Sequence, residues 1–291
     1  MYGVVIMLKS PFTYSQQIEK LREHGCNIAD EAFCEEILSR VSYYRLSAYF
    51  LTFRRKDGMY LPGTDFDKVY RLYEFDRKLR RLLFSVIEEL EVYLRAQLSY
   101  CHSHKYGADG YTNPANFNFH HNPNDFASRI SDLVRGSDKL PFVNHHIKKY
   151  EGKFPLWVIM ELFTFGMLSY FYAEMLTPDQ KKIAHNVFKT SVANAKSWLY
   201  CCTNLRNICA HSRRLYNSTF SVIPANIPNM DKYTERKLFA AVMAVRALCP
   251  SAEKWNNEFL PAMSALFDEY GDAVILRSVG FSADWESLMI K

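Results

Sequence analysis

The sequence predicts an all-α protein. Over residues 65–102 apolar side chains recur at steps of three, four or seven, as on one face of a helix. Start and stop signals for helices flank several other segments, and residues 155–176 are apolar nearly all round, as in a buried helix. We therefore expect a helical bundle with a small helical head over residues 1–62 and the main helical domain over 63–291, or one continuous domain.

The head begins with two short helices. The first is expected over residues 13–24, where Gly25 stops it, and the second over residues 30–40. Residues 40–53 are rich in aromatics at mixed spacing, so periodicity leaves helix and strand open there. Turn signals follow, with a small hairpin expected around Gly58.

The best-defined element is one long helix over about residues 65–102. Thr64 with Asp67 resembles a capping box at its start. The predicted inward positions share helical spacing: Val69, Leu72, Leu79, Val86, Leu90, Leu94 and Leu98. Residues 107–124 are rich in Asn, Gly, Pro and His and predict a long loop.

The second half of the chain predicts further helices. The segment after Pro155 is expected to be one continuous core helix. Thr177 is the expected N-cap of the next helix, with Gln180 completing a capping box. Two more helices are predicted over residues 192–211 and 231–250.

Composition limits the class of protein. Of 291 residues 48% are hydrophobic and 15% aromatic, which excludes a disordered chain. The net charge of +5 permits a polyanionic partner without requiring one. Basic residues form three clusters, each of which is either a solvated helix face or a nucleic-acid contact: Arg54, Arg55 and Lys56; Arg77, Lys78, Arg80 and Arg81; Arg206, Arg213 and Arg214.

The cellular compartment follows from two further observations. No apolar run approaches the roughly 18 residues that span a bilayer, and the opening residues are too weakly flanked for a secretory signal. The seven cysteines show no framework spacing. We expect a cytoplasmic protein with no membrane partner and no structural disulfides.

The candidate catalytic centre lies in the segment LRNICAHSRRLYN, residues 205–217. On an ideal helix Asn207 and His211 share a face, whereas Arg206 lies about 140° and about 7.5 Å from His211. Arg206 and His211 therefore converge only through the reach of arginine, a bend or end of the helix, or a second copy of the chain. The alternative is that His211 is a surface residue that favours the helix C-terminus.

These residue types suit cleavage of RNA without a metal, because the 2′-hydroxyl can serve as nucleophile. His211 can move the proton, and Arg206 can neutralise charge on the phosphoryl oxygens. Asn207 can orient the imidazole or bind the phosphate. Arg213 and Arg214 would hold neighbouring phosphates.

The segment RNICAH resembles the R-x4-H motif of HEPN ribonucleases. Four segments in order resemble the Abi family of abortive-infection proteins, of the AbiD and AbiF type: RVSYYRLSAYF, FDRKLRRLLFSVIEELEVYLR, FPLWVIMELFTFGMLS and LRNICAHSRRLYN, with VGFSADW a weaker match. The resemblance implies a HEPN-like helical domain and a metal-independent ribonuclease without cofactor, active in phage defence or as a toxin-like element. It also implies a homodimer, because the motif commonly works as a pair.

By position, Arg206, Asn207 and His211 carry over as the catalytic motif. Ser212 stands where many relatives have a second histidine, which puts the strength of the activity in doubt. Other family-like positions are Tyr44, Arg45, Asp76, Arg77, Glu91, Arg95 and Glu161.

Several of these positions have predicted supporting roles. Glu91 and Arg95 have the spacing of an ion pair, and alternatively position the catalytic centre from the long helix. Asp76 with Arg77 and Arg80 forms either a surface network or a track that binds RNA. Tyr44 and Arg45, carried over from the resemblance, are expected to support the site.

Three other functions are alternatives to RNA cleavage. A non-catalytic RNA-binding or regulatory protein would use the same basic clusters. DNA binding lacks a convincing recognition helix. A zinc site has the right ligand types but not the spacing of a closed structural site: Cys101, His102, His104, His120, His121, His145 and His146. Some relatives are linked with a small structured RNA, so the resemblance also allows an RNA or antitoxin partner.

Overall fold

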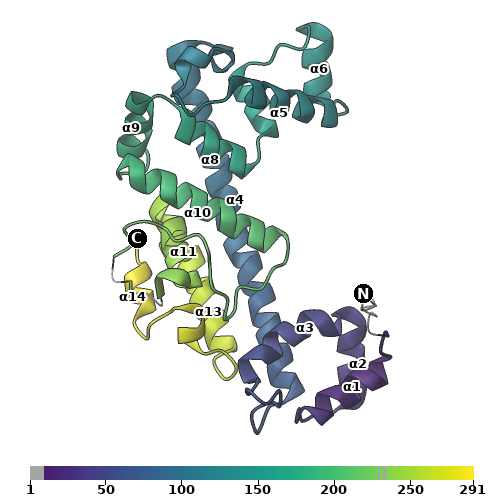
Figure 1. The fold of residues 1–291 in the computed structure, drawn as a ribbon. Coiled ribbons are helices and arrows are strands. Elements are labelled where there is room, and N and C mark those ends of the chain that lie inside the picture. The colour runs from purple at the N-terminus through teal and green to yellow at the C-terminus, as the bar shows by residue number, and fades with distance from the viewer. Residues whose placement is uncertain (1–9, 229, 232–233) are drawn as a thin grey trace, which may run out of the picture. The chain divides into compact units, whose positions relative to one another are not determined.

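The computed structural model describes residues 10–228, 230–231 and 234–291, and confirms the all-α class. Within these residues β-structure is confined to isolated bridges (Figure 1). The chain forms two compact units: residues 10–79 with 266–275, and residues 80–265 with 276–291. The predicted division at residue 62 stays a prediction.

The first compact unit opens with the two short helices that the sequence predicts. Helix α1 (Tyr14–Glu23) has a capping box between Thr13 and Gln16. It ends before Gly25, whose φ of +88° only glycine adopts without strain. Helix α2 (Glu31–Arg40) is capped by the carboxylate of Asp30.

The aromatic segment that periodicity left open is helical. Helix α3 (Tyr43–Phe50) begins at the cap residue Ser42 and continues as a 3-10 turn, Leu51–Phe53. It is helical because Leu46, Tyr49 and Phe50 lie at steps of three and four and are all buried. The hairpin expected around Gly58 is reduced to a single antiparallel bridge between Arg54 and Tyr60.

Helix α4 (Phe66–Tyr106) is the predicted long helix, extended by one turn at its end. Residues 66–79 belong to the first unit and 80–106 to the second. Its fully buried side chains include Val69, Leu72, Phe75, Leu79, Leu83, Ile87, Leu90, Leu94 and Leu98. Val86, a predicted inward position, is only half-buried, because the inward face there is taken by Leu83 and Ile87.

The core of the first unit includes residues from near the end of the chain. Phe75 packs on Phe267 with ring centroids 5.2 Å apart. Arg71 donates to the carboxylate of Asp272 over 2.6 Å. These contacts hold residues 266–275 against the first part of α4.

The segment after α4 contains more structure than the predicted loop. Two 3-10 turns, Gly110–Thr112 and Pro114–Asn116, interrupt it. Helices α5 (Pro123–Gly136) and α6 (Pro141–Lys149) were not predicted. The signals for α5 were present, since Asn122 caps a helix with proline in its first turn.

The predicted continuous core helix after Pro155 is wrong. The chain forms α7 (Leu156–Ile159), a 3-10 turn (Met160–Leu162) and then α8 (Phe165–Glu174), which Thr164 caps. The break is stable because Arg95 donates to the carbonyls of Met160, at 2.8 Å, and Phe163, at 3.1 Å. Most apolar side chains of the segment are buried, as predicted, but Trp157 and Tyr170 are exposed.

The predicted cap of the next helix is also wrong. Helix α9 (Thr177–Asn186) has Leu176 at its N-cap position, without a side-chain cap. The Gln180 amide instead donates to the carbonyls of Ala173 and Met175. The Gln180 side chain therefore links α9 to the turn that precedes it.

Helix α10 (Val192–Ala210) is the centre of the second unit and packs against α8, α9 and α11 (Leu238–Leu248) (Figure 1). Helix α11 starts later than predicted, and residues 232–233 of that prediction lie outside the described chain. The remaining elements are the 3-10 turns Thr234–Arg236 and Leu276–Val279, the π-helical turn Trp255–Phe259, and helices α12 (Ala252–Lys254), α13 (Leu260–Glu269) and α14 (Trp285–Met289).

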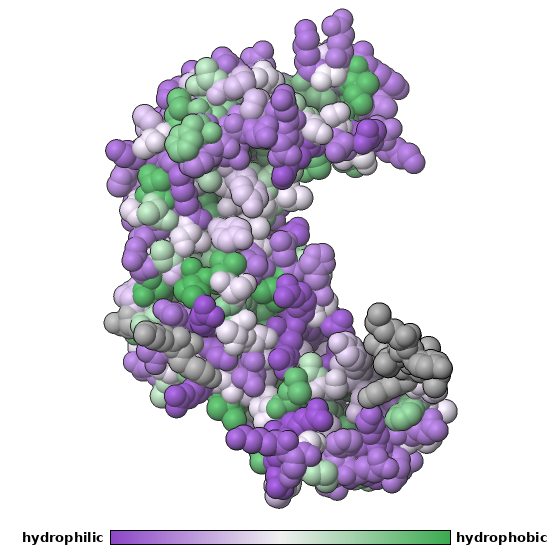
Figure 2. All heavy atoms as spheres, in the orientation of Figure 1, coloured by the Kyte–Doolittle hydropathy of each residue, from purple (hydrophilic) through white to green (hydrophobic). Residues whose placement is uncertain are grey.

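The surface is mixed in character. Hydrophilic residues cover most of the face shown in Figure 2, with small hydrophobic areas between them. Among the described residues, no helix combines the length and apolarity that crossing a bilayer requires.

Candidate active site

The apolar side of α10 fixes the orientation of the predicted catalytic segment. Four side chains of this face are all buried: Trp198, Cys202, Leu205 and Cys209. Burial raises the pKa of the neighbouring Cys201 thiol to about 12, so this thiol is protonated near neutral pH. The cysteines of α10 therefore serve packing, and the polar residues of its last turn face away from them.

His211 is the C-cap residue of α10 and is exposed. The helix ends there in a Schellman motif: Ser212 donates its N–H to the carbonyl of Cys209 at 3.1 Å, and Arg213 donates to Ile208 at 2.9 Å. Ser212 has a φ of +53° in the left-handed region that this motif requires. The motif places His211 at the negative end of the helix dipole.

Arg206 is held from the neighbouring helix. Its side chain is 31% exposed, and its Nε lies 3.6 Å from Oε2 of Glu91 on α4. At this distance the contact is an ion pair without a hydrogen bond. Its guanidinium carbon also lies 5.8 Å from the ring centroid of Phe84, within the range of a cation–π contact.

Glu91 joins two arginines. The other oxygen of its carboxylate, Oε1, lies 3.3 Å from Nη2 of Arg95, and both side chains are 14% exposed. Glu91 thus pairs within α4 and also contacts Arg206 on α10, and its role in positioning a catalytic centre stays a prediction. Through Arg95, this carboxylate is connected to the break between α7 and α8.

Asn207 is exposed beside Arg206. Its Oδ1 accepts a 3.5 Å contact from Nη1 of Arg206, at the long limit for a hydrogen bond. Its carbonyl accepts the N–H of His211 at 3.0 Å. Asn207 thus bonds to both Arg206 and His211.

The predicted RNA-binding arginines of the second unit differ in exposure. Arg213 is exposed and Arg214 half-buried. Arg80 is only 5% exposed and donates to the carbonyl of Arg213 over 3.3 Å. In this arrangement Arg80 supports the turn that follows His211, while Arg213 presents its side chain to solvent.

Four other family-like residues, Tyr44, Arg45, Asp76 and Arg77, belong to the first unit, whereas Glu161 is exposed in the second. Arg77 pairs with Glu74, its Nε lying 2.9 Å from the carboxylate. Tyr44 is 88% exposed, and Arg45 is exposed beside it. Asp76 is buried and accepts a 2.7 Å hydrogen bond from the hydroxyl of Tyr49.

The residues considered for zinc have other surroundings. His102 is buried among aromatic rings, including Phe117 at 5.4 Å between centroids. His121 pairs with Glu174 at 2.7 Å, and His146 contacts the carbonyl of Phe142. Across the described chain, no three His, Cys, Asp or Glu side chains are grouped to hold a metal ion.

Sequence reasoning missed two parts of this site. The Schellman turn was missed because serine gives no signal for a left-handed residue. Phe84 was missed although it lies seven residues before Glu91, and therefore on the same face of α4.

A sequence model of the Abi-like protein family matches residues 36–217, which include Glu91, Arg206 and His211. No curated protein and no solved structure gave a significant match. The match covers more than half of the chain and supports a role in abortive infection, and the chain belongs to the Abi-like protein family.

Proposed function

We propose that this protein is a metal-independent HEPN endoribonuclease that acts in abortive infection or as a toxin-like element. The observation that carries the proposal is the last turn of α10, where Arg206 is held by Glu91 and an exposed His211 ends the helix. The first group suits a phosphate and the second suits proton transfer near neutral pH.

The proposed reaction uses a nucleophile that belongs to the RNA. His211 takes the proton of a 2′-hydroxyl, and the 2′-oxygen attacks the adjacent phosphorus. The bond to the 5′-oxygen breaks, and this oxygen takes a proton, which leaves a 2′,3′-cyclic phosphate. Arg206 stabilises the charge on the phosphoryl oxygens, and Asn207 orients either group.

We further propose that the active form is a homodimer. One chain supplies one R-x4-H motif, and in a dimer the second copy's His211 would protonate the leaving 5′-oxygen. Light scattering at micromolar concentration tests this proposal. A monomer that still cleaves RNA would contradict it.

The direct test incubates purified wild-type protein and His211→Ala with total RNA in EDTA. We expect cleavage by the wild type and none by His211→Ala, because general acid–base catalysis contributes about 10²–10⁴ in rate. His185→Ala is the matched control, since His185 is also an exposed histidine in the last turn of a helix. Wild-type cleavage by His211→Ala, with its melting temperature unchanged, would refute the assignment.

A second candidate is a non-catalytic RNA-binding protein, which is favoured by Ser212 at the position after His211 and by the exposed Arg213. Binding measured in the His211→Ala background separates the two. Arg213→Ala with Arg214→Ala should lower the affinity for single-stranded RNA and reduce the log–log salt slope by roughly 1.4, at about 0.7 per contact. Binding of RNA by a wild-type protein that never cleaves it would favour this second function.

A further inference from the structure

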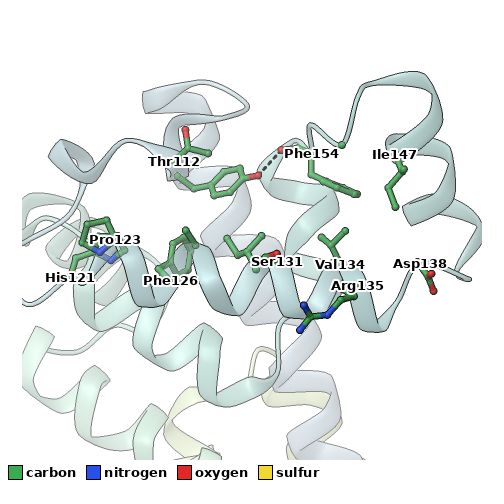
Figure 3. Close-up of a pocket in the computed structure, with 14 residues that line it drawn as sticks. Thr112, His121, Pro123, Phe126, Ser131, Val134, Arg135, Asp138, Ile147 and Phe154 are labelled. Carbon is green, nitrogen blue, oxygen red and sulfur yellow. Dashed lines mark hydrogen bonds between the residues drawn. The ribbon is translucent and has the colours of Figure 1, made fainter.

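A short wall within the second unit separates two hollows. The hydroxyl of Tyr111 donates to the carbonyl of Phe154 over 2.9 Å, the bond drawn dashed in Figure 3. Both residues are buried, and both line the hollow on each side. Tyr111 and Phe154 therefore form a boundary that the two hollows share.

The hollow on the α5 side is apolar and has a volume of about 470 Å³. Phe126 and Val134 point from α5 toward Phe154 and Ile147 (Figure 3). Arg135 at its edge is paired with Asp132 over 2.6 Å. This hollow has no feature that selects a particular ligand.

The groove on the other side differs in chemistry and is larger, at about 1080 Å³. Two of its aromatic side chains are turned to solvent: Trp157 is 51% exposed and Tyr150 is 45% exposed. Lys149 and Lys153 are exposed in the same lining. The groove thus combines two exposed aromatic side chains with ammonium groups, and Nζ of Lys149 lies 5.4 Å from the ring centroid of Tyr150.

The aromatic groups are held from both sides. The ring of Tyr150 lies 5.1 Å from that of His146, which itself stacks on Phe154 at 5.2 Å with an interplanar angle of 16°. Trp157 follows Leu156, whose N–H donates to the carbonyl of Ala108 over 2.8 Å. A ligand that stacks here would therefore contact two supported side chains. Tyr150 packs against His146, and Trp157 follows a residue whose backbone N–H is hydrogen-bonded.

We propose that this groove binds single-stranded RNA by base stacking on Trp157 and Tyr150. Bases offer flat faces to such rings whatever their sequence, and neighbouring phosphates would reach Lys149 and Lys153. A duplex cannot use the groove in this way because its base faces are already stacked. This inference goes beyond the catalytic turn of α10, and it rests on the proposed action on RNA.

The groove also contains two carboxylates, Asp109 and Glu151. Carboxylates repel phosphate but accept hydrogen bonds from the exocyclic amino groups of bases. Their presence in the same lining favours a mode in which bases point into the groove and the backbone runs along the lysines. It also makes stacking, rather than charge alone, the main source of affinity.

The test measures fluorescence anisotropy of a labelled single-stranded RNA oligonucleotide with the full chain carrying His211→Ala, so that RNA is bound but not cut. Adding Trp157→Ala should weaken binding by roughly ten- to a hundred-fold, whereas Trp157→Phe should retain most of the affinity. Tyr170→Ala is the matched control, because Tyr170 is 55% exposed on α8 and does not line this groove. Lys149→Gln with Lys153→Gln should lower the salt slope by roughly 1.4.

Several outcomes would overturn the groove as an RNA site: unchanged affinity in Trp157→Ala and in the double lysine variant, equal affinity for a duplex, or no RNA binding at all. Thermal melts of each variant show that it is folded. Cleavage is measured separately in chains that retain His211. If the wild type does not cleave but binding depends on Trp157, the groove stands and the catalytic proposal fails; the reverse pattern overturns only the groove.

Discussion

Glu91 on α4 and Arg206 on α10 form an ion pair across the helix interface, with 3.6 Å between Oε2 and Nε. The same carboxylate lies 3.3 Å from Arg95, and both of these side chains are 14% exposed. One negative charge thus serves two arginines where solvent screening is weak. This arrangement holds the side chain of Arg206 against α4.

Glu91→Gln should destabilise the fold by about 1–3 kcal/mol, because two half-buried guanidinium groups lose their shared anion. Urea unfolding measures the change. Glu89→Gln is the matched control on the same helix, since its pair with Lys254 is about half exposed and should contribute less than about 0.5 kcal/mol. Equal effects of the two substitutions would show that Glu91 has no special role.

Stability should fall in mild acid because of His102, whose side chain is buried with no hydrogen-bond partner at either ring nitrogen. Burial lowers the pKa of His102 to about 4. In the unfolded chain the imidazole of His102 takes up a proton near pH 6.5. Burial of the neutral imidazole therefore carries no pH-dependent cost above that pH. The free energy of unfolding falls by about 3 kcal/mol in total as pH falls from about 6.5 to about 4.

Urea unfolding between pH 7.5 and 4 tests this prediction. His102→Leu should flatten the profile because it removes the titrating group. His104→Leu should not, because His104 is exposed. An unchanged profile in His102→Leu would mean that other groups cause the acid sensitivity.

Gly280→Ala should destabilise the protein by about 2 kcal/mol or more. Gly280 has a φ of +82°, and an added Cβ would lie 2.5 Å from Cβ of Lys237. Gly136→Ala, at the end of α5 with nothing within 4 Å of the added atom, should be neutral or slightly stabilising. Thermal melts compare the two, and similar melting temperatures would contradict the steric argument.

Lys291→Met should cost about 1–3 kcal/mol. The Lys291 ammonium donates to the carbonyls of Arg246, at 2.7 Å, and Cys249, at 2.5 Å, at the C-terminal end of α11. Arg246 in turn donates to the carbonyls of Met289 and Ile290. Urea unfolding of this variant is compared with Lys181→Met, an exposed lysine that should change stability by less than about 0.5 kcal/mol. A loss no larger than that of the control would contradict the predicted role.

The sequence predicted the features that depend on local spacing. The all-α class, α1, α2, α4 and α10 followed from periodicity and capping residues, because a helix buries one face and its ends need hydrogen-bond partners. The Abi family was recognised from four segments that lie within residues 36–217, and the match over these residues confirms the family.

Only the tertiary structure decided what depends on contacts between distant residues. The apolar segment after Pro155 is broken because Arg95, sixty-five residues before Met160, supplies donors to the carbonyls at the break. Arg80 points inward and donates a hydrogen bond to the carbonyl of Arg213. A cluster of basic residues in the sequence does not predict this contact. Glu91 contacts Arg206 because α4 and α10 bring them together, and periodicity records the face of each helix but not the residue opposite.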